Sequence, residues 1–225
     1  MRHMRLVFVC LALVGCAQAS GTPGDDTEDV DASVQRDGSI GDASNIDAPP
    51  GPCVNMTKNL LRNGTFETTP AGVDWNATPI DATLPIVTNE AGGVAAQSPA
   101  YRAWMAGLEV PATTNKDVLY QDVAVPPMTT KLELKGSYEV RTGETGTNIY
   151  DRATVELTST TNTQLELIKA IDDNGATTAW TPFNKLFTGA YSGMTVRLRF
   201  STASDSLDAT SFFFDSLELN ATFCQ

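Results

Sequence analysis

Apolar and polar residues alternate along most of the second half of the chain. In KLELKGSYEV, every second position from Leu132 to Val140 is apolar, aromatic or glycine, and charged or small polar residues fall between them. MTVRLRF and ATVELTS repeat the pattern around Leu198 and Val155. A period of two places successive side chains on opposite faces of an extended chain, so these stretches predict β-strands. Further strands are expected at 102–108, 118–125, 164–170 and 212–223.

The segments between the expected strands are rich in turn-forming residues. Examples are VPATTNKD, VPPMTT, RTGETGTN, DDNGATT and FTGAYSG. No segment has a sustained apolar stripe with the 3.6-residue period of a helix. Many short strands at regular spacing without helices indicate an all-β protein with an antiparallel β-sandwich.

Residues 1–15 have a different character. Arg2 and Arg5 precede an apolar run at 6–14 that is too short for a comfortable transmembrane helix. The run ends in LVGC, which resembles the lipobox of bacterial lipoprotein signal peptides. The resemblance implies that 1–15 are a signal peptide and that Cys16 becomes the lipidated N-terminus. An ordinary secretory signal cut near AQA is the alternative, and it would discard Cys16.

Residues 16–52 are acidic and contain no aromatic side chain. Eight of them are Asp or Glu, and one is Arg. Such a segment cannot bury enough apolar surface to offset the entropy of ordering, so a disordered tether is expected. The whole chain has a formal net charge of −12. Its runs of carboxylates argue against nucleic acid and anionic lipid surfaces as partners.

Three motifs follow one another in the remaining residues, 53–225. They are NLLRNGTFE with a Trp after a polar loop, AYRAWMAGLE with VLYQDVAVP, and SFFFDSLEL near the end. Together they resemble the galactose-binding-like jelly rolls, in particular carbohydrate-binding modules of the family 4/9/22 type. The resemblance implies an antiparallel jelly-roll β-sandwich over 53–225 that binds carbohydrate without catalysis. Two departures are WMAG in place of WLGG, and Ser216 where a second Asp is usual.

The same resemblance implies a structural Ca²⁺ held by Glu67 and Asp215, the Glu after Asn-Gly-x-Phe and the near-terminal Asp. The residues raise the question independently. Asp215 shares its alternation with Leu217 and Leu219, which should face the core, and an ionised carboxylate is not buried there without a partner. Either the strand bulges and turns Asp215 outward, or a hard cation compensates the charge. The alternative is two solvated or Arg-paired carboxylates.

Cys53 and Cys224 are expected to form a disulfide. They flank the domain, and an exported chain permits oxidation. In a jelly roll the first and last strands commonly adjoin, which would bring the two residues within bridging range.

Few catalytic arrangements are open to this composition. The only histidine is His3, inside the expected signal peptide, so His-based triads and zinc sites are absent from the mature chain. Paired carboxylates remain, because Glu139, Glu144 and Asp151 flank one turn. Scattered carboxylates on sandwich loops are usually solvated, so an enzyme is the weakest of the functions considered.

Candidate ligand-binding residues are aromatic and planar polar side chains, because sugar C–H faces stack on rings and hydroxyls pair with planar polar groups. Trp75 and Tyr150 stand in or beside polar loops, with core packing as the alternative. Polar positions on two strands would line a groove if those strands are neighbours, and are otherwise a solvated face. These positions are Glu139, Arg141, Arg197 and Arg199. Gln121 shares a face with apolar residues and is expected to be buried and hydrogen-bonded.

The sequence therefore predicts a non-catalytic binding module for a glycan or another surface polymer, outside the cytoplasm on a bacterial membrane. Ala17 follows the lipobox Cys, which by resemblance to enterobacterial sorting rules implies the outer membrane. Two alternatives remain open. One is a structural or assembly lipoprotein whose sandwich contacts a protein partner, and the other is a carboxylate-dependent glycosidase or lyase.

Overall fold

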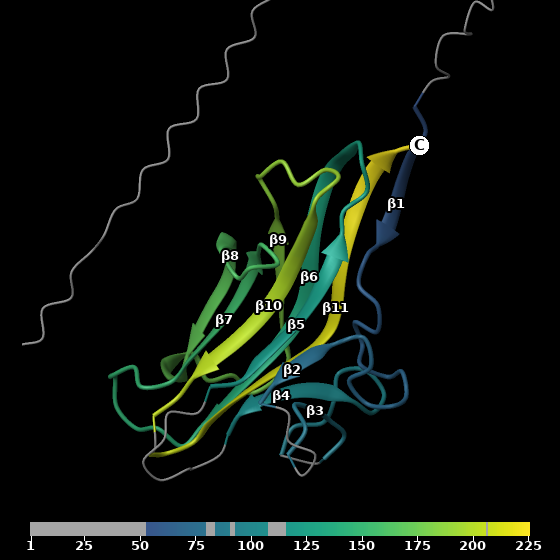
Figure 1. The fold of residues 1–225 in the computed structure, drawn as a ribbon. Helices are drawn as coiled ribbons and strands as arrows, with labels where there is room; N and C mark the ends of the chain where they lie inside the picture. Colours follow the sequence, from purple (N-terminus) through teal and green to yellow (C-terminus); the bar gives the residue numbers. More distant parts are fainter. Residues whose placement is uncertain (1–52, 80–83, 91–92, 108–115, 206) are drawn as a thin grey trace, which may run out of the picture. The chain divides into compact units, whose positions relative to one another are not determined.

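The alternating stretches form antiparallel strands that pair into two facing sheets (Figure 1). The computed structural model describes residues 53–79, 84–90, 93–107, 116–205 and 207–225. The expected signal peptide at 1–15, the lipidated Cys16 and the acidic linker at 16–52 lie outside these residues. In the described part of the chain, no helix is long and apolar enough to cross a membrane.

The larger sheet has six described strands, and all of its pairs are antiparallel. Its order is β3 (Val87–Thr88), β4 (Arg102–Ala106), β11 (Thr210–Cys224), β6 (Thr129–Thr142) and β9 (Thr181–Leu186), with β1 (Asn55–Asn59) also paired to β11. The long strands β6 and β11 pair along most of their length, so they form the centre of this sheet.

The smaller sheet has five described strands, again all antiparallel. Its order is β2 (Asn76–Thr78), β5 (Val118–Ala124), β10 (Thr195–Ala203), β7 (Arg152–Thr158) and β8 (Gln164–Asp172). One 3₁₀ turn, η1 (Asp173–Gly175), follows β8. The prediction of an all-β antiparallel sandwich is confirmed. Sequence alternation missed β1 and β9, and also the edge strands β2 and β3, which have only three and two residues.

The core lies between the inward faces of the two sheets, and the sequence alternation predicted those faces correctly. On β10, Val196, Leu198 and Phe200 are fully buried. The ring of Phe200 lies 4.8 Å from that of Phe214 on β11, across the sandwich. Burying a side chain of this size contributes about 1.5–3 kcal/mol. Gln121 is also buried, and its side chain exchanges two hydrogen bonds with the backbone of Arg62, as predicted.

A β-bulge in β11 resolves the alternation problem at Asp215. The pairing register with β6 shifts between Asp215 and Glu218, and Ser216 has a φ of 54°. The extra residue lets Phe214 and Leu217 both join the core, while Asp215 belongs to the outward-facing set. The bulged strand, one of the two possibilities open from the sequence, is therefore the observed one.

Glycine at position 64 brings the NGTFE motif against this bulge. The amide of Leu217 donates a 2.9 Å hydrogen bond to the carbonyl oxygen of Gly64. A Cβ atom at position 64 would lie 2.1 Å from the Leu217 carbonyl oxygen, so no larger residue fits without a backbone shift. The contact places Glu67, three residues on, beside the outer face of β11.

The two ends of the domain meet at a disulfide. Cys53 and Cys224 are bonded, with their Cα atoms 5.4 Å apart. The bond sits at the end of the β1–β11 pair, where Asn55 faces Cys224 and where Val54 and Gln225 exchange backbone hydrogen bonds. The predicted bridge is confirmed, and its basis is the expected adjacency of the first and last strands.

Candidate functional site

The outer face of the five-stranded sheet gathers polar and aromatic side chains. Tyr120 and Asp122 on β5 have the opposite parity to the buried residues of that strand. Arg197 pairs in register with Asp122, and Arg199 pairs with Tyr120 on one side and Glu156 on the other. Strand pairing thus brings charged residues from three strands into adjacent rows.

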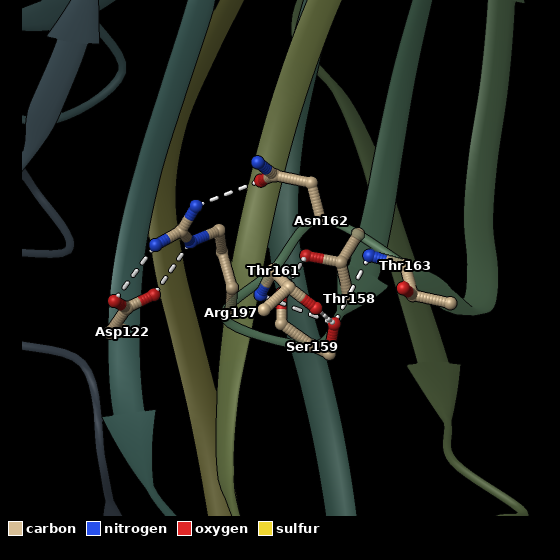
Figure 2. Close-up of polar contacts among 7 residues, drawn as sticks. All are labelled: Asp122, Thr158, Ser159, Thr161, Asn162, Thr163 and Arg197. Atoms are coloured by element: carbon tan, nitrogen blue, oxygen red, sulfur yellow. Dashed lines mark hydrogen bonds and ion pairs between the residues drawn. The ribbon is translucent and has the colours of Figure 1, made fainter. Parts of the chain in front are cut away.

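Arg197 is held from three directions. Its Nε and one terminal nitrogen donate to the two carboxylate oxygens of Asp122 at 2.7 and 3.0 Å, and its other terminal nitrogen donates to Asn162 Oδ1 at 2.8 Å (Figure 2). Its guanidinium carbon lies 3.8 Å from the centre of the Tyr120 ring. The Asp122 hydrogen bond raises the pKa of Arg197. The side chain is only 11% exposed, so this planar cluster is already ordered for a ligand.

The turn between β7 and β8 supplies Asn162. Its backbone has a φ of 65°, and its amide donates to the carbonyl oxygen of Ser159 at 3.0 Å. The Ser159 hydroxyl accepts a hydrogen bond from the Thr163 amide at 3.1 Å and lies 2.9 Å from the Thr161 hydroxyl. Figure 2 shows this local network closing the turn behind Asn162. The turn therefore holds the Asn162 side chain whose Oδ1 accepts the hydrogen bond from Arg197.

Beside this cluster, a cavity of about 410 Å³ lies at the edge of the sandwich. Residues of the edge strands β2 and β3 line it, together with Tyr120, Trp75 and Leu119. The volume falls in the range of roughly 300–1,000 Å³ that is typical of small-ligand sites. Tyr120 belongs to both the cavity wall and the Arg197 cluster, so the two features adjoin at this residue.

Trp75 contributes less to this site than the sequence suggested. Its ring is 9% exposed and packs 5.3 Å from Phe66 and 6.1 Å from Phe200. Its indole nitrogen donates to the carbonyl oxygen of Asn63 at 2.9 Å. The expectation of an exposed aromatic platform at Trp75 is corrected, because the NGTFE loop draws the ring into the core and leaves only its edge on the cavity.

The four polar positions proposed as one groove lie on two different sheets. Glu139 and Arg141 are on β6 in the six-stranded sheet, whereas Arg197 and Arg199 are on β10 in the five-stranded sheet. Glu139 is only 3% exposed and forms an ion pair with Arg141. Arg199 pairs with Glu156 at 3.0 Å. The expected common groove is corrected, since alternation assigns a residue to a face of its strand but not to a sheet.

Tyr150 lies in the connection between β6 and β7 and is exposed. Its hydroxyl accepts a hydrogen bond from Asn148 Nδ2 at 2.9 Å. Only two of the three carboxylates expected around this turn lie close together. Glu144 and Asp151 come together and are joined by Asp173 from η1, whereas Glu139 is paired with Arg141 elsewhere.

Glu67 and Asp215 converge on Ser98, in the loop that precedes β4. The Ser98 hydroxyl oxygen lies 2.9 Å from Glu67 Oε1 and 2.9 and 3.0 Å from the two carboxylate oxygens of Asp215. The carbonyl oxygens of Thr65 and Tyr101 lie 3.0 and 3.2 Å from the same atom. One hydroxyl has a single proton to donate, so this group has more acceptor oxygens than protons.

Both carboxylates also accept backbone hydrogen bonds. Burial raises the pKa of Glu67, but hydrogen bonds from the Tyr101 and Ala100 amides and from Ser98 outweigh it, and the net pKa is lowered. Asp215 is fully buried, and that burial raises its pKa despite bonds from the amides of residues 97, 98 and 216. Carboxylate, carbonyl and hydroxyl oxygens are the donor set that Ca²⁺ prefers, so these residues fit the predicted ion.

Several site residues were missed by sequence reasoning. Tyr120 and Asp122 had a signal, since the alternation in VLYQDVAV assigns them to the face opposite Leu119 and Val123. Asn162, Ser98 and Asp173 had none, because they lie in turns and loops that approach their partners only after folding. Their sequence neighbourhoods are ordinary turn sequences.

No protein-family model and no curated protein matches this chain. Among solved structures, it is similar to a family 61 carbohydrate-binding module in complex with β-1,4-galactotriose, with 14% identity over 75% of this chain and 99% of that one, at a TM-score of 0.51. A family 16 carbohydrate-binding module has 21% identity over 72% of this chain and 99% of its own, at 0.41. A xylan-binding family 22 domain from Paenibacillus barcinonensis has 14% identity over 74% and 92%, at 0.39. The first of these likenesses shows that the domain has the β-sandwich fold of a carbohydrate-binding module.

Proposed function

We propose that this chain is a non-catalytic module that binds a glycan on the outer face of its five-stranded sheet. The observation that carries the proposal is the Arg197 cluster, in which Asp122, Asn162 and Tyr120 hold a guanidinium beside a cavity of about 410 Å³. Ordered planar groups bind sugar hydroxyls without a large entropic cost, and an aromatic wall suits the C–H faces of a sugar. The fold shared with a module solved with β-1,4-galactotriose supports glycans as the ligand class to test first.

Replacing Arg197 with Ala is expected to weaken glycan binding by about 10–100-fold, because a charged hydrogen-bonding group contributes roughly 1.5–3 kcal/mol. The full chain would be screened on an array of plant and bacterial polysaccharides that includes β-1,4-galactotriose and xylan. The affinity for the best probe would then be measured by calorimetry. Tyr120→Ala should weaken binding as well, since it removes both the cavity wall and the surface under the guanidinium.

Arg62→Ala is the matched control for charge. Its side chain is 72% exposed and makes one described ion pair, with Asp74 at 3.4 Å, and neither residue belongs to the Arg197 cluster. Tyr150→Ala tests the exposed aromatic that the sequence proposed. Equal affinity of the Arg197 variant and the wild type would contradict the site. Absence of any glycan ligand, with one stoichiometric protein retained on the chain, would instead favour the alternative of an assembly lipoprotein.

We further propose that Glu67 and Asp215 bind a structural Ca²⁺, with Thr65 and Tyr101 carbonyl oxygens and the Ser98 hydroxyl as neighbouring donors. The oxygen-rich group around Ser98 supports it, as does the complete burial of Asp215, whose described hydrogen bonds come from backbone amides and the Ser98 hydroxyl while the charge of Arg102 acts on it only through space. When bound, the ion would supply charge compensation and no catalysis. The residues themselves would tie the NGTFE loop and the loop before β4 to the bulge of β11.

The proposed location is the bacterial outer membrane, outside the cytoplasm, where a lipid on Cys16 and the acidic linker at 16–52 would hold the module. A single acyl chain gives only marginal membrane binding, whereas several chains anchor a protein firmly. Cys16→Ser should abolish incorporation of labelled palmitate in a Gram-negative host and shift the protein out of the outer-membrane fraction.

Cys10→Ser is the control for this experiment, because Cys10 lies within the apolar run of the expected signal peptide. It should leave labelling and fractionation unchanged. Palmitate labelling that survives in the Cys16 variant, or a wild-type protein that carries no label, would contradict lipidation at Cys16.

A further inference from the structure

Three carboxylates from two connections meet at one end of the sandwich. Glu144 belongs to the connection after β6, Asp151 stands immediately before β7, and Asp173 begins the 3₁₀ turn after β8. One oxygen from each lies within 4.8 Å of the others. Asp151 is completely buried and Asp173 is 3% exposed, so water does not screen their mutual repulsion.

Among the residues that the structure describes, two oxygens of this cluster have no hydrogen-bond partner. Asp151 Oδ2 and Glu144 Oε1 are both buried and accept no hydrogen bond. The other oxygen of Asp151 accepts from the Asp205 amide at 2.9 Å. Asp173 is more fully bonded, since it accepts from the amides of Tyr150 and Asn174. A buried carboxylate oxygen without a donor is costly, because the group has lost its water and gained nothing in exchange.

The charges around the cluster make this cost larger. Burial raises the pKa of Asp151, and the negative charges of Asp205 and Asp173 raise it further against hydrogen bonds from Thr210 and the Asp205 amide. Burial likewise raises the pKa of Glu144, followed by the charges of Asp208, Asp205, Asp151 and Asp173. Every charged neighbour that acts on these two groups is therefore another carboxylate.

We propose that Glu144, Asp151 and Asp173 bind a divalent cation, Ca²⁺ by its chemistry, at a second site separate from Glu67 and Asp215. A cation placed between the three carboxylates would cancel their repulsion and bring a positive charge close to the two carboxylates that have an unpartnered oxygen. The cluster contains only oxygen donors, which favours a hard cation over zinc or copper. Mg²⁺ usually keeps several waters and is held by only one or two carboxylates, so a set of three carboxylates, two of them buried, favours Ca²⁺.

The ion has a structural consequence for the exposed surface. The Asp173 carboxylate accepts hydrogen bonds from the amides of Tyr150 and Asp151, so the same residue holds the chain that carries the exposed Tyr150. A cation at the cluster would fix the connection between β6 and β7 against η1. This role does not depend on glycan binding at Arg197, because none of its residues belongs to that cluster.

The test counts calcium ions on the full chain, purified in mild detergent, by native mass spectrometry and equilibrium dialysis. The wild type is expected to bind two ions, and Glu144→Gln and Asp151→Asn should each bind one. Glu67→Gln should also lose one ion, and its combination with Glu144→Gln should lose both. In chelator, Glu144→Gln should melt at or above the wild-type temperature, because it removes a repulsive charge. Calcium at a hundred times Kd should raise the wild-type melting temperature by on the order of 5–10 °C per site.

Glu218→Gln is the matched control, since Glu218 is exposed and bonds only to Asn220 among the described contacts. It should bind two ions. Glu144 is partly exposed, so its variant tests the site even if Asp151→Asn does not fold. The proposal is overturned if the Glu144 variant retains the wild-type number of calcium ions. It is equally overturned if the Glu67 variant binds none, because then the second cluster holds no ion of its own.

Discussion

Removal of the Cys53–Cys224 disulfide is expected to lower the free energy of unfolding by about 2–5 kcal/mol. The bridge joins residues 171 positions apart and thus closes nearly the whole domain. Closing so long a loop removes much conformational freedom from the unfolded chain, by roughly 5 kcal/mol in the chain-entropy account. The double variant Cys53→Ser/Cys224→Ser should therefore melt about 5–15 °C below the oxidised wild type.

Without the disulfide, unfolding should begin at β1. All five residues of this strand are exposed, and it is held to β11 by backbone pairing and by the disulfide at its end. Hydrogen exchange should show β1 amides losing protection first, while the amides of β10 keep theirs. Reductant should lower the melting temperature of the wild type but not that of the double variant. Two free thiols in non-reduced peptides, or equal melting of the two proteins, would contradict this account.

Calcium is expected to stabilise the domain through Glu67 and Asp215, and chelation should lower the melting temperature by about 5–10 °C when calcium had been a hundred times Kd. Asp215 has no exposed surface, and its carboxylate accepts hydrogen bonds from three backbone amides and from the Ser98 hydroxyl. A bound cation would compensate the buried charge and fix the loop before β4. Thermal unfolding of the oxidised full chain, with EGTA or with millimolar calcium, measures the increment.

Glu67→Gln and Asp215→Asn should each reduce that increment, because both keep the shape of the side chain and remove its charge. Glu218→Gln, at an exposed position of the same strand, should leave it unchanged. A second calcium site is proposed at Glu144, so calcium should still stabilise each variant to some extent. The decisive quantity is therefore the calcium-dependent rise in melting temperature of each variant compared with that of the wild type. If calcium raised the melting temperature of both variants as much as that of the wild type, the proposed Glu67–Asp215 site would be contradicted.

The NGTFE motif explains why a carboxylate stands beside a core aromatic. Phe66 is fully buried with a φ of 64°, and this turn points the next residue, Glu67, away from the core. Gly64 allows the turn to touch the bulge of β11, where Asp215 faces outward. A backbone reversal at each of the two positions therefore presents its acidic side chain to the same loop. The two carboxylates meet at Ser98 because the local turn beside each of them directs its side chain there.

The sequence by itself determined which strand residues face the core and that the two ends of the domain, at Cys53 and Cys224, meet. Alternation along β6, β7 and β10 identified the buried face, because a strand has a fixed period of two. The expected jelly roll placed the first and last strands together, and the disulfide between Cys53 and Cys224 follows that adjacency. Each of these features rests on local geometry or on a simple topological rule.

Only the tertiary structure decided which polar residues become neighbours. Arg197 meets Asp122 and Asn162, whereas Glu139 meets Arg141 on the other sheet. Alternation cannot distinguish these outcomes, because it specifies neither the sheet to which a strand belongs nor the register in which two strands pair. Both depend on pairings between residues far apart in the sequence, such as the 75 positions between Asp122 and Arg197. Loop residues such as Ser98 and Asp173 acquire their partners in the same way, through the packing of whole strands rather than through their own neighbours.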